Sequence, residues 1–111
     1  MKIKYGFVTN SSSSNFLLLG ISDQKKISQA KDLLNYDEDR DYLDHGYWEK
    51  GGFFLLGGYY EIYYAGIEPH ELLETMTLPE AKKEVQKRFQ ELGMNVDISD
   101  IELVYGEFGE G

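Results

Sequence analysis

The stretch FFLLGGYYEIYYAGI, residues 53–67, predicts a β-hairpin from which the rest of the fold can be worked out. Phe53 to Leu56 is a short apolar run of the kind found in buried strands. Gly57-Gly58 fits a two-residue turn that needs positive φ, and Tyr59 to Ile67 reads as the return strand. In that return strand, aromatic side chains fall on both faces at a period of two. We therefore expect an antiparallel pair of strands here.

Three further segments have the pattern of strands. Residues 3–7 alternate, with Ile3, Tyr5 and Phe7 on one face. Phe16 to Leu19 is apolar on both faces, which suits a central strand that is covered on both sides or at its ends. These two segments are predicted to form a hairpin with a long loop. Residues 101–106 alternate again and give the last strand, before a tail rich in Gly and Glu.

Two helices are predicted from their caps and their apolar spacing. The first follows an N-cap at residues 22–23 and ends near Asn35. The second has the clearest local signal, because Thr77 and Glu80 form a capping-box pair and Gly93 follows the last turn. A short helical turn over Pro69 to Thr75 precedes it.

Residues 36–50 are polar and acidic, and we interpret them as a surface excursion that Gly51 and Gly52 close. The resulting order, β-β-α-β-β-α-β, predicts a single α+β domain over residues 1–111. Its sheet would be mainly antiparallel, with about five strands and two main helices on one face. The face without helices would carry Tyr and Lys side chains.

The composition restricts the classes of function. The 111 residues hold 20 acids against 11 Lys and Arg, so the formal net charge is -9 and the chain repels phosphate backbones and anionic lipid heads. Direct binding to nucleic acid or membrane is therefore not expected. The absence of Cys excludes disulfides and thiolate metal sites. No apolar signal-peptide run follows the first residues, so we expect a soluble protein in the cytoplasm.

The segment GFVTNSSSSNF, residues 6–16, places four serines in the predicted hairpin loop. It has neither the Gly-x-Ser-x-Gly frame of a serine nucleophile nor the glycines and lysine of a phosphate loop. The segment resembles the G-F-V-[ST]-N-S-S-S-[ST]-x-F start of uncharacterised bacteriophage and prophage proteins, except that Asn15 stands where another serine is common. The resemblance implies a phage or prophage origin and a processing or recognition tag at Asn10, Ser11, Ser12, Ser13 and Ser14, and it implies no catalytic residue. With such an origin, the expected location is the cytosol of the host cell.

Other patterns with chemical meaning are incomplete. Asp37, Asp39 and Asp41 alternate as in an EF-hand loop, but Tyr42 and Trp48 occupy the positions that need Gly and Glu. The two histidines, His45 and His70, show no helical zinc-site spacing. Glu61 lies among tyrosines, where burial would raise its pKa, although a carboxylate that points to water is the more common case. We expect no metal, no cofactor and no catalytic residue.

Residues 37–49 combine six acids with aromatic side chains, and a second acidic region follows Arg88, after which no Lys or Arg occurs. Acids beside aromatic anchors suit an interface that docks on a basic protein surface. The candidate partner-binding residues are Asp37, Glu38, Asp39, Asp41, Tyr42, Asp44, Tyr47 and Trp48.

We therefore expect a small acidic phage-type accessory protein that binds a basic surface of a host or phage protein. An inhibitor of a nucleic-acid-handling or defence factor would be one form of it. Acidic loops that only keep the protein soluble would give the same composition. Two other functions stay open: a phage accessory or structural protein that self-associates through its tyrosines, and a small enzyme without a recognisable motif, with its pocket near His45, Glu61 or His70.

Overall fold

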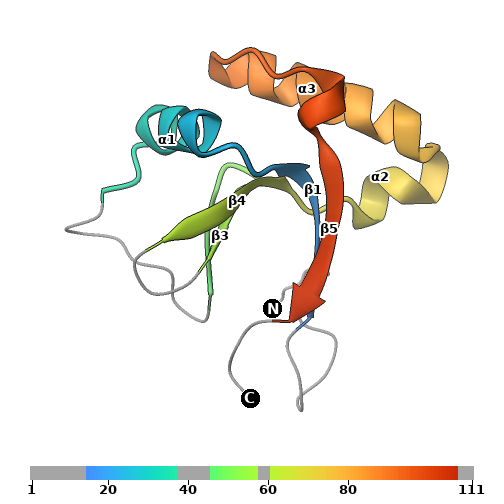
Figure 1. Cartoon of the computed structure of the whole chain (residues 1–111). Helices are drawn as coiled ribbons and strands as arrows, with labels where there is room; N and C mark the ends of the chain where they lie inside the picture. The colour runs from blue at the N-terminus through green and yellow to red at the C-terminus, as the bar shows by residue number, and fades with distance from the viewer. Residues whose placement is uncertain (1–14, 38–45, 58–60, 108–111) are drawn as a thin grey trace.

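Five antiparallel strands form one sheet in the computed structural model of the chain, which describes residues 15–37, 46–57 and 61–107 (Figure 1). The strands are β1 (Asn15–Ile21), β2 (Tyr47–Lys50), β3 (Phe53–Gly57), β4 (Ile62–Ile67) and β5 (Glu102–Glu107). Their order in the sheet is β2-β3-β4-β1-β5, so β2 and β5 are the edge strands of the described sheet. The strand predicted at residues 3–7 lies outside the described residues.

The helices are α1 (Gln24–Leu33), α2 (His70–Thr75) and α3 (Leu78–Leu92), and a 3₁₀ turn, η1 (Ile98–Asp100), precedes β5. The two main helices, α1 and α3, contribute buried side chains to one core cluster with residues from β1, β3 and β4. In Figure 1 both helices lie on the same side of the sheet. The predicted α+β fold, with an antiparallel sheet and two main helices, is confirmed.

The helix ends follow the capping signals in the sequence. Asp23 is the N-cap of α1, and its carboxylate accepts a hydrogen bond from Lys26 N at 3.1 Å. At the start of α3, Thr77 and Glu80 form both hydrogen bonds of the capping box. Gly93 ends α3 with φ of 118°, the left-handed conformation that glycine adopts without a steric penalty. The helix predictions are confirmed.

The prediction of a surface excursion through residue 50 was wrong at its end, because Tyr47–Lys50 forms β2. This strand pairs with β3 through the tight turn at Gly51 and Gly52, whose φ angles are 61° and 90°. Two successive positive φ angles are typical of the turn that matches the twist of a two-strand hairpin. The two glycines that we interpreted as the close of a loop therefore make the tight turn of a hairpin.

The prediction of a tight turn at Gly57-Gly58 was also wrong. Gly57 belongs to β3 and is paired with Ile62, where β4 begins, so β3 and β4 are not joined by a two-residue turn. The register shifts between Leu56 and Gly57, which is a local irregularity in the ladder. Residues 58–60 lie outside the described residues.

The middle of the sheet is a short junction between β1 and β4. β1 is paired with β5 over residues 15–20, but with β4 only at Leu19, Gly20 and Ile21. Gly20 lies directly opposite Gly66. A Cβ on Gly20 would stand 2.1 Å from the carbonyl oxygen of Ala65. The two backbones therefore approach more closely than any side chain would allow.

Both faces of the sheet are apolar. On the helix side, the cluster includes Leu19 and Ile21 of β1, and on the opposite side Leu18 packs with Leu56 and Val104. Leu18 and Leu19 are both fully buried, so the prediction of a central strand covered on both sides is confirmed for β1. The side without helices also carries partly buried aromatic side chains, namely Phe16, Tyr47, Phe54 and Tyr64.

Candidate functional site

The structure describes only part of the acidic and aromatic region that we predicted to bind a partner. Asp37 is exposed just after α1. Tyr47 and Trp48 are neighbours on β2 and are both half-buried. The remaining predicted residues, Glu38, Asp39, Asp41, Tyr42 and Asp44, lie outside the described residues, as do Asn10, Ser11, Ser12, Ser13 and Ser14 of the predicted tag.

The two described aromatic residues of that region pack on opposite faces of the sheet. Trp48 contacts Tyr36 edge-on, with ring centroids 5.0 Å apart, and packs against the core on the helix side. The ring centroid of Tyr47 lies 5.9 Å from that of Phe54, and Tyr47 belongs to the cluster on the other side of the sheet. Consecutive residues of a strand point to opposite faces, so these two side chains do not share one surface.

The second acidic region is better described, and its carboxylates are exposed. The acids after Arg88 whose side chains the structure describes are Glu91, Asp97, Asp100 and Glu102. Asp97 and Asp100 belong to the η1 turn, where the Asp97 carboxylate accepts a hydrogen bond from Ser99 N. Glu102 begins β5 and accepts a hydrogen bond from Ser22 Oγ at 3.2 Å. Among the described side chains, these acids form no ion pair with Lys or Arg.

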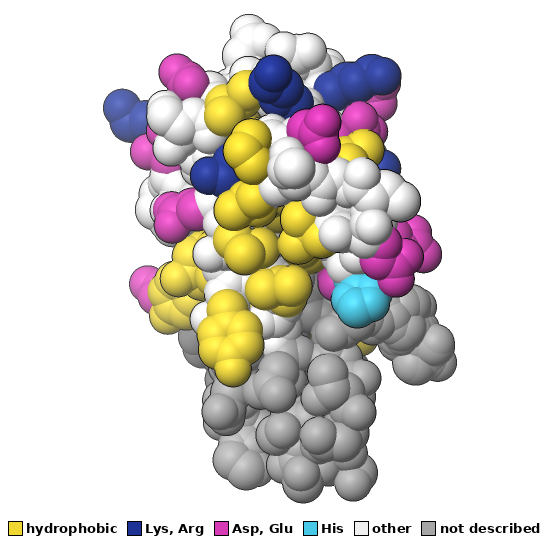
Figure 2. Space-filling view, turned by 90° about the vertical axis from the view of Figure 1, so that its right-hand side faces the viewer, with side chains coloured by type: hydrophobic (Ala, Val, Ile, Leu, Met, Phe, Trp, Pro, Cys, Tyr) yellow, Lys and Arg dark blue, Asp and Glu magenta, His cyan; other side chains and the backbone are white. Residues whose placement is uncertain are grey.

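Exposed apolar side chains lie on the same strand as Glu102. Leu103 is 40% exposed and Tyr105 is 75% exposed, the largest value among the exposed large hydrophobic side chains of the described residues. Figure 2 shows the side of the molecule where β5 and α2 lie, and hydrophobic side chains form a band down this face with Asp and Glu at its borders. Lys and Arg gather mainly at the upper end of the view. We call Asp97, Asp100, Glu102, Leu103 and Tyr105 the β5 surface. It includes both faces of the strand, because Leu103 and Tyr105 point to the helix side of the sheet and Glu102 points to the other side.

The sequence contains a weak signal for this surface. Alternation correctly grouped Ile101, Leu103 and Tyr105 on one face of the last strand, and Ile101 is buried. Leu103 and Tyr105 lie opposite Leu19 and Leu17 in the ladder with β1, so they point to the helix side of the sheet. The alternation does not say how far the helices extend over that face. The exposure of Leu103 and Tyr105 was therefore missed.

Glu61 lies at a hollow of about 420 Å³ between the first turns of α1 and the start of β4. It is exposed, and its carboxylate accepts a hydrogen bond from the Tyr63 hydroxyl at 3.0 Å. This hydrogen bond raises the pKa of Tyr63. Gln24 closes one side by donating a hydrogen bond to the carbonyl of Ile62. The hollow is open, and the Tyr63 hydroxyl and the Gln24 side-chain amide are both used in these hydrogen bonds.

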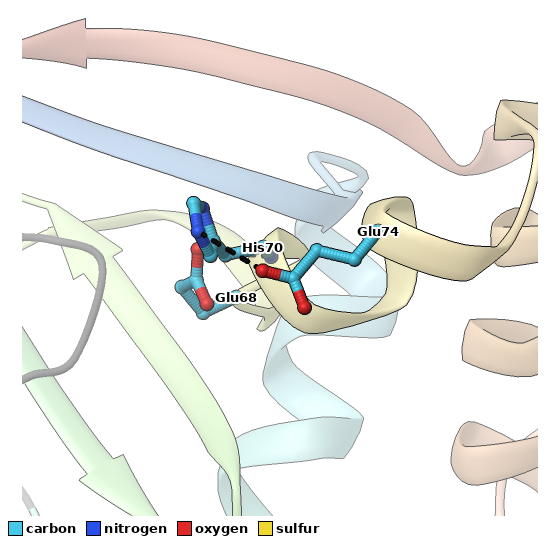
Figure 3. Close-up of polar contacts among 3 residues, drawn as sticks. All are labelled: Glu68, His70 and Glu74. Carbon is cyan, nitrogen blue, oxygen red and sulfur yellow. Dashed lines mark hydrogen bonds and ion pairs between the residues drawn. The ribbon is translucent and has the colours of Figure 1, made fainter.

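His70 lies near two carboxylates at the start of α2, as Figure 3 shows. Its backbone N–H donates a hydrogen bond to Glu68 Oε2 at 3.0 Å, and its Nε2 lies 3.8 Å from Glu74 Oε2. Partial burial raises the pKa of Glu68, and the hydrogen bond from His70 opposes that shift. Both His70 and Glu74 are exposed, so their contact lies at the surface of the protein. Within the described ranges, no group of three or more metal-ligating side chains occurs. His45 lies outside those ranges.

Comparison with known proteins does not assign the chain to a family. No family model matches it, and neither the curated proteins nor the solved structures include a significant match. In the part of the chain that the structure describes, no helix has both the length and the apolar character needed to cross a bilayer.

Proposed function

We propose that this chain is a small phage-type accessory protein that binds a basic surface of a host or phage protein. One form of this function is inhibition of a factor that handles nucleic acid or serves in defence. The observation that supports the proposal best is the β5 surface. Its exposed carboxylates, Asp97, Asp100 and Glu102, come just before the exposed Tyr105 in the chain.

The charge of this surface suits a basic partner. No Lys or Arg follows Arg88, so residues 89–111 carry six acids and no side chain that is positive at neutral pH. Opposite charges on two proteins increase the association rate, and an exposed aromatic side chain gains binding energy when a partner covers it. The net charge of -9 repels nucleic acid itself, which supports a protein as the partner.

The proposal is tested by capture followed by kinetics. The immobilised chain is incubated with a bacterial lysate at about 0.05 M salt and, separately, at about 0.5 M salt. The higher salt concentration shortens the electrostatic screening length several-fold. Proteins retained only at low salt are identified and purified. Their association with the chain is then measured by surface plasmon resonance across the same range of salt. We expect the association rate to fall steeply as salt rises.

Two triple variants locate the charges that matter. One replaces Asp37, Asp39 and Asp41 with Asn, and the other carries Asp97→Asn, Asp100→Asn and Glu102→Gln. We expect each to lower the association rate about three- to tenfold with a smaller effect on dissociation, because exposed charges act mainly on the encounter. The amide side chains keep the hydrogen-bond acceptors of Asp97 and Glu102, so the local fold is retained.

A variant that loses positive instead of negative charge is the control. Replacing Lys82 and Lys83 on α3 with Gln removes positive charge, so it should leave the association rate unchanged or increase it. Capture that is indifferent to salt, or an equal loss of rate for the acidic and the basic variants, would reject the proposal. Self-association without a captured partner would favour the alternative of a phage structural protein.

A further inference from the structure

The outer edge of β5 has no partner strand among the residues that the structure describes (Figure 1). β5 is six residues long and is paired with β1 along its inner edge from Glu102 to Glu107. An edge strand presents a row of N–H and C=O groups that can pair with another extended chain. Addition of a strand to such an edge is a common mode of peptide recognition.

The side chains of β5 differ between the two faces of the sheet. Leu103 and Tyr105 point to the helix side, and both are exposed. Glu102 and Val104 point to the opposite side, where Val104 is buried against Leu18 and Glu102 is exposed. A strand added at this edge would therefore meet apolar side chains on one face and a carboxylate at the start of the other.

The charge around the edge determines which kind of strand fits. Asp97 and Asp100 lie in the turn that leads into β5, and no Lys or Arg occurs from residue 89 onward. Side chains directly opposite in an antiparallel pair stand about 5 Å apart, so a base opposite Glu102 would be stabilised and an acid would be repelled.

The same charge argues against a second copy of this chain. If two β5 strands were paired edge to edge, each would bring Glu102 and the preceding Asp100 to a strand that contains no positive side chain. Like charges at neighbouring positions of a ladder destabilise the pair. A basic segment of another protein has no such penalty.

We propose that the outer edge of β5 binds an extended segment of the partner in which Lys or Arg alternates with apolar residues. The added strand would place its apolar side chains beside Leu103 and Tyr105 and its bases on the face of Glu102. This inference rests on the proposed function, since it identifies the part of the basic partner that makes the contact.

The experiment uses the full chain and defined peptides. The probe is a fluorescent peptide with the sequence Lys-Val-Lys-Val-Lys-Val, blocked at both ends, and a Glu-Val peptide of the same length is its charge control. A third peptide carries N-methyl groups on alternate residues of the Lys-Val sequence, and a fourth carries them on the other set. Only one register of alternate N–H groups can face β5, so one methylated peptide should lose binding and the other should keep it.

Variants of the chain test the apolar contact. We expect Tyr105→Ala to weaken binding of the Lys-Val peptide about tenfold or more, as is usual for a tyrosine that a partner covers. Tyr63→Ala is the matched control, because Tyr63 is also an exposed tyrosine but lies on β4 beside α1. It should leave the affinity unchanged. Amide hydrogen exchange should slow at alternate residues of β5 when the peptide binds.

Several outcomes overturn the inference. These are equal binding of the Lys-Val and Glu-Val peptides, loss of binding with both methylated peptides or with neither, and no change in exchange along β5. A dimer of the chain that Tyr105→Ala dissociates would make a second copy the occupant and would also overturn it. If the captured protein still binds in a salt-sensitive manner to Tyr105→Ala with unchanged affinity, the proposed function stands while the edge contact is refuted. If no salt-sensitive partner exists but the Lys-Val peptide binds at β5, the proposed function fails by itself.

Discussion

Replacing Gly66 with Ala tests whether the sheet depends on the close approach of β1 and β4. A Cβ on Gly66 would stand 2.3 Å from the carbonyl oxygen of Leu19 and 2.6 Å from Gly20 Cα, whereas ordinary contacts begin at 3.4 Å. Both opposing atoms are backbone atoms, so no side-chain rotation relieves the clash. The two strands would have to separate by about 1 Å, which takes N–H···O bonds beyond their useful length.

The cost follows from the shortness of the junction. β4 is paired with β1 only through Ile67, Gly66 and Ala65, and this junction joins the β2-β3-β4 half of the sheet to β1 and β5. Ladder hydrogen bonds contribute about 1 kcal/mol each and overpacking costs about 1–3 kcal/mol, so we expect a loss of about 3 kcal/mol or more. For a domain of this size, that corresponds to a fall in Tm of about 10 °C or more.

The assay is thermal and urea unfolding followed by circular dichroism and by the fluorescence of Trp48. Gly51→Ala is the control, since its Cβ would meet no atom within 4 Å but its φ of 61° is unfavourable for alanine. That conformational cost is about 1–2 kcal/mol. If Gly66→Ala were no more destabilising than Gly51→Ala, the sheet would not depend on the close approach of the β1 and β4 backbones.

Three further predictions concern the starts of α2 and α3. Thr77→Ala removes the N-cap of α3 and should cost about 0.5–2 kcal/mol in urea unfolding, while Thr77→Ser should restore most of the loss. The hydrogen bond from Thr77 N lowers the pKa of Glu80 below the unfolded value of 4.5. The ionised carboxylate of Glu80 therefore contributes to stability above pH 4.5, and this contribution is lost as the pH falls through the folded pKa. Glu80→Gln should make the loss of stability on the acid side less steep. Partial burial raises the pKa of Glu68 above its unfolded value of 4.5. Ionisation of Glu68 therefore lowers the stability of the protein as the pH rises from 4.5 through the folded pKa. Glu68→Gln should therefore stabilise the protein slightly at pH 7 and not at pH 4, and equal effects at the two pH values would contradict this reasoning.

The elements that were predicted correctly have local causes. The Thr77–Glu80 capping box and Gly93 determine where α3 starts and ends through hydrogen bonds and a backbone angle that involve only nearby residues. The apolar pattern of Phe16 to Leu19 likewise predicted a central strand, and Leu18 and Leu19 are fully buried on opposite faces. Such signals are readable because the interacting groups are a few residues apart in the chain.

The errors arose where two local patterns compete for the same role. Gly51-Gly52 and Gly57-Gly58 are both compatible with a tight hairpin turn, and the sequence gives no reason to prefer the first pair. The choice depends on which strands pair, because Tyr47–Lys50 finds a partner in β3 only when the turn is at Gly51 and Gly52. The strand Tyr47–Lys50 was not predicted because the segment before it is acidic and polar. In the structure, Trp48 of this strand packs against Tyr36 and the core.

The sequence by itself determined the α+β class, the positions of the helices and the excess of negative charge in residues 89–111, since these depend on residue type and local spacing. Only the tertiary structure decided that β5 lies at the edge of the described part of the sheet, that Leu103 and Tyr105 lie beyond the cover of the helices, and that Tyr47 and Trp48 belong to opposite faces. The physical reason is that exposure depends on which distant elements pack together. A side chain's own neighbours in the chain do not specify that packing.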